Sequence, residues 1–240
     1  QQLRRLEQAI PSLALEPKDL KEIRFGDTVL LKAVQVQGAV EKFERFGVGP
    51  RFCALVKDEL HERLSRRLSQ MSKDDEIQEE MLGLDVDEQV QIFGETISPD
   101  DEKETADLTQ KYLEHRYAEA HNLIDTLAWI RFDRIGMRLL GQQALSATEW
   151  LYLKLLITGA GDKNARYVMI DEVQDYTESQ LMVLARHFSR AHFLLLGDEN
   201  QAIVEGTATF PQIKSIFEET HGSVEECRLL TSYRSSPEIT

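Results

Sequence analysis

The stretch "YVMIDEVQDYTESQ", residues 167–180, places several carboxylates directly after a short apolar run. Nearly continuous apolar runs such as this one, and "HFLLLGD" at 192–198, are typical of strands that are covered on both faces. Charge at the end of a buried strand is costly to desolvate unless a cation lies beside it. The first question is therefore which cation these carboxylates face.

Strand-like and helix-like segments alternate around this stretch. "TESQLMVLARHF", residues 177–188, opens with a capping box from Thr177 to Gln180 and predicts a helix between the two apolar runs. Further along, the sequence predicts a second helix at "PQIKSIFEET" (211–220), a third strand at "ECRLL" (226–230) and the start of another helix at "SSPEIT" (235–240). Short connections in this order predict parallel strands in an α/β sheet.

Polar clusters follow all three predicted strands, at residues 171–174, 197–201 and 232–234. Ligands of open parallel sheets bind at the carboxyl ends of the strands. Hydrolysis of a nucleoside triphosphate needs the side chains found there. One carboxylate holds Mg²⁺, a second orients water, an amide senses the terminal phosphate and an arginine neutralises its charge.

Three motifs carry a resemblance to a known family. "IDEVQD" (170–175), "LLGDENQAI" (195–203) and "SYRSSPEI" (232–239) look like motifs II, III and IV of UvrD/Rep-type superfamily 1 helicases, in the same order. The resemblance covers roughly residues 151–240. It implies an α/β fold with part of a RecA-like parallel sheet, of the P-loop NTPase type. The charged helical segment before motif II and "LYLKLLITG" (151–159) look most like the HelD/helicase IV branch, some members of which act on RNA polymerase.

The resemblance implies roles for individual residues. Asp171 would position Mg²⁺, and Glu172 would act as the general base or orient the attacking water. Gln201 would read the γ-phosphate and couple it to nucleic-acid binding, and Arg234 would contact the γ-phosphate. Four further residues would support the metal and the water: Gln174, Asp175, Gly197 and Asp198. A plainer alternative is that strand-end Asp and Gln residues cap the next helix and that Arg234 pairs with a surface acid.

The sequence contains no G-x-x-x-x-G-K-[ST] phosphate loop. The nearest stretch, "GAGDKN" at 159–164, precedes a predicted strand instead of opening a helix, so we interpret it as a turn. Nothing resembles the family's later motifs V and VI either. These observations predict an internal fragment of a larger motor, which alone neither binds ATP tightly nor hydrolyses it.

The region before the α/β part has a helical pattern. We predict a segment of the first RecA-like domain at 1–26, a large, mainly helical inserted domain at 27–147, and the part of the RecA-like core with motifs II, III and IV at 148–240. The local predictions are a helix at 27–46 capped by Asp27, a helix at 49–71 with Pro50 in its first turn, a short strand at 88–96, and one long helix at 98–130 capped by Ser98.

Most of the net charge of −14 lies in residues 74–107, which contain fourteen acidic residues and only one basic residue, Lys103. Duplex-binding domains usually carry the opposite charge. The acidic stretch is either a solvated face or a projecting element that meets a basic partner. In addition, Ile203, Val204 and Glu205 stand where this family usually has aromatic residues that stack on bases. Both features favour a motor directed to a protein partner.

Other site types have little support. The six histidines show no H-E-x-x-H pattern, and "RLSRRLSQMSK" (63–73) is a basic stripe typical of a solvated helix face. The two cysteines, Cys53 and Cys227, lie far apart and predict free thiols in a reducing compartment, which we expect to be the cytoplasm. No apolar run approaches the ~20 residues that span a bilayer, so no membrane partner is expected.

The leading hypothesis is part of an ATP-dependent DNA helicase that uses Mg²⁺ and ATP and acts on single-stranded or duplex DNA. The first alternative is a HelD-like ATPase that binds and remodels RNA polymerase through its acidic helical insertion. A second alternative, a non-catalytic interaction module, is disfavoured because it would not need the acid pair Asp171–Glu172 or Arg234.

Overall fold

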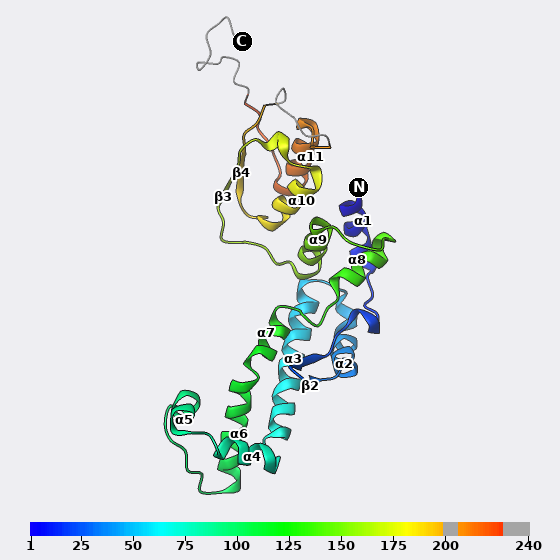
Figure 1. Ribbon diagram of the computed structural model, residues 1–240. Coiled ribbons are helices and arrows are strands. Elements are labelled where there is room, and N and C mark those ends of the chain that lie inside the picture. Colours follow the sequence, from blue (N-terminus) through cyan, green and yellow to red (C-terminus); the bar gives the residue numbers. More distant parts are fainter. Residues whose placement is uncertain (199–205, 228–240) are drawn as a thin grey trace, which may run out of the picture. The chain divides into compact units, whose positions relative to one another are not determined.

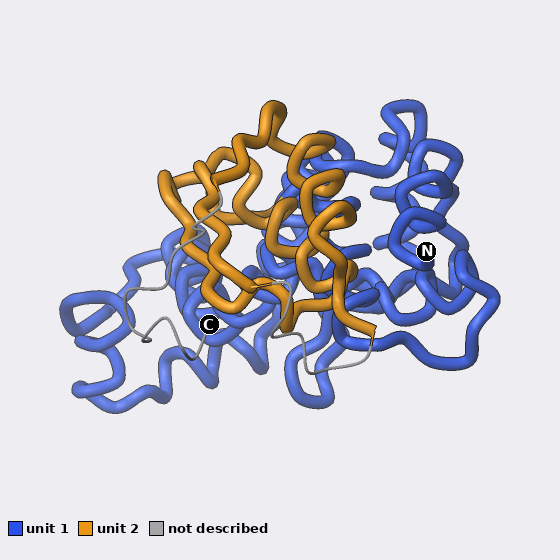
Figure 2. Tube along the Cα trace, turned by 90° about the horizontal axis from the view of Figure 1, so that it is seen from above, with its two compact units in different colours: residues 1–159 blue, residues 160–240 orange. Residues whose placement is uncertain are grey.

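In the computed structural model, the chain forms two compact units, residues 1–159 and residues 160–240 (Figure 2). The structure describes residues 1–198 and 206–227. Two predicted site residues, Gln201 and Arg234, lie outside the described residues. Most of the third predicted strand at 226–230 and the helix start at 235–240 lie outside them too.

The first unit is mainly helical, with one small antiparallel hairpin (Figure 1). Its elements are α1 (Gln2–Ala9), β1 (Ile23–Phe25), β2 (Thr28–Leu31), α2 (Ala33–Phe43), α3 (Pro50–Met71), α4 (Asp75–Leu82), α5 (Val86–Phe93), α6 (Glu102–Arg116), α7 (Ala118–Asp125), α8 (Phe132–Leu140) and α9 (Ala147–Thr158). "LYLKLLITG" therefore belongs to a helix, α9, which ends where Gly159 adopts a left-handed conformation at φ 61°.

Helix α3 is the longest element of the first unit, and it confirms the helix predicted at 49–71. Pro50 occupies its first turn, where a missing N–H costs nothing. Its apolar stripe is buried against α2, α6, α7 and α9. The stripe consists of Phe52, Val56, Leu60, Leu64 and Leu68.

Three local predictions in the helical region are wrong. The helix predicted to start at Asp27 starts at Ala33 instead, because residues 28–31 form β2 of the β1–β2 hairpin, which Gly26 turns at φ 55°. The strand predicted at 88–96 is largely occupied by helix α5, which Asp85 caps and Gly94 ends at φ 86°. The helix predicted at 98–130 is two helices, α6 and α7, and Asp101 caps the first of them.

The second unit contains β3 (Tyr167–Ile170), α10 (Glu178–His187), β4 (His192–Leu195) and α11 (Phe210–His221). β3 and β4 pair in parallel, as predicted, with Tyr167 opposite His192 and Ile170 opposite Leu195. α10 and α11 confirm the two predicted helices. The capping box from Thr177 to Gln180 is present at the start of α10.

The two faces of the β3–β4 sheet differ in exposure. On one face, Phe193 of β4 packs against Phe217 of α11, with ring centroids 4.8 Å apart. On the other face, the side chains of Tyr167 and Met169 are 80% and 67% exposed, and Leu194 is 51% exposed. Parallel sheets are normally covered on both faces. The described residues therefore leave one apolar face of this sheet open.

Both cysteines are free, as predicted, but their surroundings differ. Cys53 is buried in α3, its Sγ lies 3.6 Å from the carbonyl oxygen of Ile157, and burial raises the pKa of its thiol to about 11. Because a raised pKa keeps the thiol protonated below pH 11, Cys53 should resist alkylation at pH 8, whereas exposed Cys227 should react. Mass spectrometry after iodoacetamide treatment, with and without denaturant, measures this. Equal labelling of both thiols in the folded protein would contradict it.

No helix within residues 1–198 and 206–227 is both long enough and apolar enough to cross a bilayer.

Candidate functional site

Asp171 and Glu172 directly follow β3 and are both exposed to solvent. The carboxylate of Asp171 accepts the backbone N–H of Glu172 at 2.9 Å. Glu172 adopts the left-handed region, at φ 50° and ψ 46°, which is uncommon for a residue with a Cβ. Backbone strain of this kind is often found at functional sites. No pattern in the sequence signals it.

Gln174 connects the segments that follow the two strands. Its side chain is buried, within the short 3₁₀ turn Val173–Asp175. Its Nε2 donates to the Glu172 carboxylate at 2.6 Å, and its Oε1 accepts the backbone N–H of Asp198 at 3.1 Å. The structure thus brings the first predicted cluster together with Gly197 and Asp198, the described residues of the second.

Gly197 leaves the space that this connection needs. A Cβ at position 197 would lie 2.5 Å from Oε1 of Gln174 and 2.9 Å from Cγ1 of Val173. The backbone also holds the two segments together, because the N–H of Val173 donates to the carbonyl of Leu196 at 2.8 Å. A larger residue at 197 would therefore displace the Gln174 side chain.

The helix that follows does not use the acidic cluster as its cap. Thr177 caps α10, accepting the N–H of Gln180. Asp175 is exposed, and its N–H donates to the carbonyl of Glu172 at 2.9 Å. Asp171, Glu172 and Asp175 therefore remain available for a ligand instead of being required for the helix start.

The donor set at this edge suits Mg²⁺ bound mainly through water and phosphate. Mg²⁺ usually takes one or two carboxylates from the protein and keeps several waters or substrate oxygens. Asp171 and Glu172 supply two exposed carboxylates at the strand end. Within the described ranges, no group of three or more His, Cys, Asp or Glu residues could hold a metal ion by itself.

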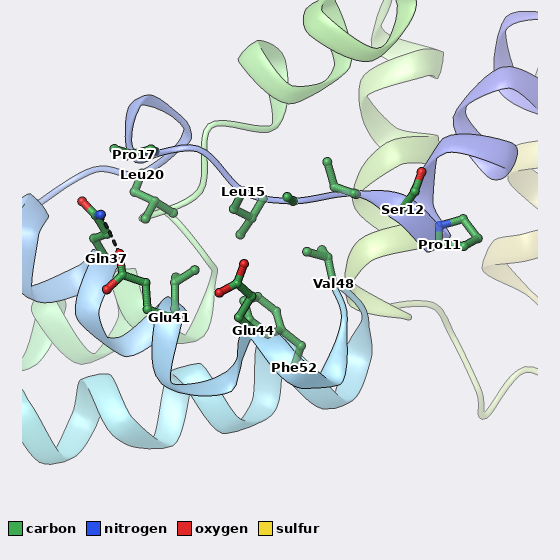
Figure 3. A pocket seen from close by; sticks show the side chains of 13 residues that line it. Pro11, Ser12, Leu15, Pro17, Leu20, Gln37, Glu41, Glu44, Val48 and Phe52 are labelled. Carbon is green, nitrogen blue, oxygen red and sulfur yellow. Dashed lines mark hydrogen bonds between the residues drawn. The ribbon is translucent and has the colours of Figure 1, made fainter.

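A pocket of about 360 Å³ lies elsewhere, in the first unit (Figure 3). It is lined by residues 11–15, Pro17 and Leu20, and by side chains between Gln37 and Phe52 that include Glu41 and Glu44. None of the strand-end residues lines it. Two strands cannot enclose a nucleotide, so a binding cleft at the β3–β4 edge would need residues from further segments.

Replacing Gln174 tests whether the connection matters for the site. Gln174→Ala should remove the side-chain acceptor of the part-buried Asp198 N–H and the donor to Glu172, and should lower the free energy of unfolding of this chain by about 1 kcal/mol. Gln174→Glu keeps an acceptor for Asp198 but places a second carboxylate beside Glu172, so it should also destabilise the chain. Urea denaturation followed by circular dichroism measures both. Wild-type stability in both variants would show that the contacts contribute nothing.

A comparison with known protein families gives a match over most of the chain. The family model described as the UvrD/REP helicase N-terminal domain matches residues 54–205, a span that contains most of α3, all of α4 to α10, both parallel strands and the carboxylate cluster. No curated protein matched the sequence.

Proposed function

The chain belongs to the UvrD/REP helicase N-terminal domain family, and from this premise we propose that it forms part of an ATP-dependent DNA helicase or translocase motor. The proposal includes a RecA-like core that the described β3–β4 sheet begins, and a helical insertion in the first unit. We further assign the chain to the HelD branch, on its "LYLKLLITG" stretch and its long charged helical segment.

The observation that best supports this proposal is the connection made by Gln174. In a motor, the state of the nucleotide must be transmitted from the acidic motif to the next strand. Gln174 contacts the carboxylate of Glu172 with one end of its amide and the backbone of Asp198 with the other. A shift of the Glu172 carboxylate would therefore move the Gln174 amide, and with it the backbone at Asp198, where the segment that leads to Gln201 begins.

The proposed roles follow from position and charge. Bound Mg²⁺ would supply charge neutralisation at the β- and γ-phosphates. Asp171 would hold that ion, directly or through water. Glu172, oriented by the Gln174 amide, would accept a proton from the attacking water or align it. Gln201 and Arg234 would contact the γ-phosphate, with Asp175, Gly197 and Asp198 in support.

ATP hydrolysis by the intact protein and by this chain tests the proposal. We expect the intact protein to hydrolyse ATP and single-stranded DNA to stimulate it. The 240-residue chain alone should show no turnover, because its sequence has no phosphate loop of the Walker type. An intact protein that neither binds nor hydrolyses ATP would contradict the proposal.

The acidic segment supports a second candidate function, an ATPase that binds and remodels RNA polymerase. Residues 74–107 span α4, α5 and the start of α6, and three apolar side chains there, Leu82, Val86 and Val90, are 47–61% exposed. A surface with carboxylates around exposed apolar side chains complements a basic protein surface better than it complements the negatively charged phosphate backbone of DNA.

Neutralising the segment separates the two candidates. Glu76, Glu79 and Asp87 are exposed and do not cap a helix, so E76Q/E79Q/D87N should leave the fold intact. If the second candidate is right, this variant should lose binding to purified RNA polymerase in a pull-down and retain binding to single-stranded DNA. Unchanged polymerase binding, or none by the wild-type chain, would favour the DNA motor.

A further inference from the structure

A basic and aromatic cluster lies where the segment after α2 leads into the first turn of α3, outside the strand-end site. The guanidinium carbons of Arg45 and Arg51 lie 4.9 Å and 4.7 Å from the centroid of the Phe46 ring. Phe43 supports this ring from the end of α2, with centroids 6.4 Å apart. Two cations thus share one aromatic side chain. We call Arg45, Phe46 and Arg51 the arginine clamp.

The positive charge of the arginine clamp is not neutralised by an ion pair with any described residue. Among the described residues, neither Arg45 nor Arg51 has a carboxylate within 4.0 Å. Lys42, three residues before Arg45, is already engaged by buried Glu59. Glu44 belongs to the same loop but lines the neighbouring pocket, as Figure 3 shows. Two like charges held close together favour an anion beside them.

Contact with the Phe46 ring holds the two guanidinium groups in place for phosphate oxygens. A guanidinium that lies over a ring keeps its N–H donors at its edge, where they can form bidentate contacts. The position of the arginine clamp is also well defined. Pro50 and Arg51 open the long helix α3, and that end of α3 is anchored by the buried side chain of Phe52. Less side-chain freedom is therefore lost when a ligand binds.

We propose that the arginine clamp binds adjacent phosphates of a single-stranded nucleic acid, without reading its sequence. This inference rests on the proposed function, since a helicase motor must hold a strand while it moves. A strand offers phosphates at regular short intervals, which suits two guanidinium groups on one ring better than a single isolated anion does. The helical unit would thus contribute its own contact to the strand, separate from the motifs of the second unit.

Fluorescence anisotropy with a labelled oligothymidine, titrated with the 240-residue chain, tests the inference. R45A/R51A should weaken binding by roughly tenfold and should reduce the slope of log K against log salt by about 1.4, or about 0.7 for each lost phosphate contact. R45K/R51K keeps the charge but loses the planar guanidinium with its paired N–H donors, so it should bind with intermediate affinity. An oligothymidine and a mixed-sequence strand of equal length should bind alike.

The matched control is R5A/R24A, which removes the same charge from two exposed arginines of the same unit. If it weakens binding as much as R45A/R51A, the effect is general electrostatics and the inference is wrong. Absence of strand binding by the wild-type chain at low salt would also overturn it. Neither result would affect the motor assignment, which depends on ATP hydrolysis by the intact protein. Circular dichroism of each variant shows whether it is folded.

Discussion

Glu172→Gln in the intact protein should lower the rate of ATP hydrolysis by at least about a hundredfold, the effect expected when a group that acts on the developing charge is lost. Gln is nearly the same size but cannot accept a proton from water. The side-chain oxygen of Gln at position 172 can still accept the N–H of the Gln174 side chain, so the loop should keep its shape. Nucleotide binding should therefore be retained. Steady-state phosphate release and binding of a fluorescent ATP analogue measure the two effects separately.

Glu178→Gln is the matched control for this prediction. Glu178 lies in the first turn of α10, close to the cluster in sequence, but it has no role in the proposed site. Its substitution should leave turnover within about twofold of wild type. If Glu172→Gln hydrolyses ATP at the wild-type rate, the role proposed for Glu172 is wrong. If it also loses nucleotide binding, Glu172 contributes to the site mainly through ground-state contacts.

Asp19→Ala should lower the free energy of unfolding of the chain by about 3 kcal/mol, a large part of a typical domain's stability. Asp19 is fully buried, and its carboxylate lies 2.6 Å from Arg138 and 3.4 Å from Arg134, both of α8. It also accepts the N–H of Glu16 at 2.9 Å. Removing the carboxylate leaves the two partly buried guanidinium groups only the more distant Glu16 as an acidic partner, at 4.0 Å from Arg134 and 3.5 Å from Arg138.

Asp19→Asn separates the contributions to this effect. Asn keeps an acceptor for the Glu16 N–H but loses the charge, so its destabilisation should be smaller than that of Ala. Asp27→Ala, at the exposed hairpin turn, is the surface control and should change stability by no more than about 0.5 kcal/mol. Urea denaturation gives all three values. Equal stability of Asp19→Ala and Asp27→Ala would show that the buried ion pairs are not stabilising.

Several elements could be predicted because their signals are local. α3 has Pro50 in its first turn and a continuous apolar stripe, and α10 has the capping box that begins at Thr177. β3 and β4 are short apolar runs, and the helix between them makes parallel pairing the expected arrangement. In each case, the residues that determine the element lie within it or directly beside it.

The wrong predictions concern segments whose local sequence fits more than one kind of structure. The segment 86–93 is short and weakly periodic, so its helical state depends on the caps Asp85 and Gly94. The hairpin at 23–31 depends on burial of Leu30 and Leu31, which a helical spacing would also have explained. The break between α6 and α7 at Tyr117 follows from packing, since that side chain is buried and contacts Phe25 of β1 edge to face.

The sequence by itself determined the family, the parallel pairing of β3 and β4, and the identity of the candidate residues, because motif spacing and apolar runs are properties of the chain alone. Only the tertiary structure decided that Gln174 joins the carboxylate of Glu172 to the backbone of Asp198, and that Arg45 and Arg51 meet on one ring. Contacts of this kind depend on backbone angles and side-chain directions. These are set by the packing of the whole unit and leave no periodic trace in the order of residues.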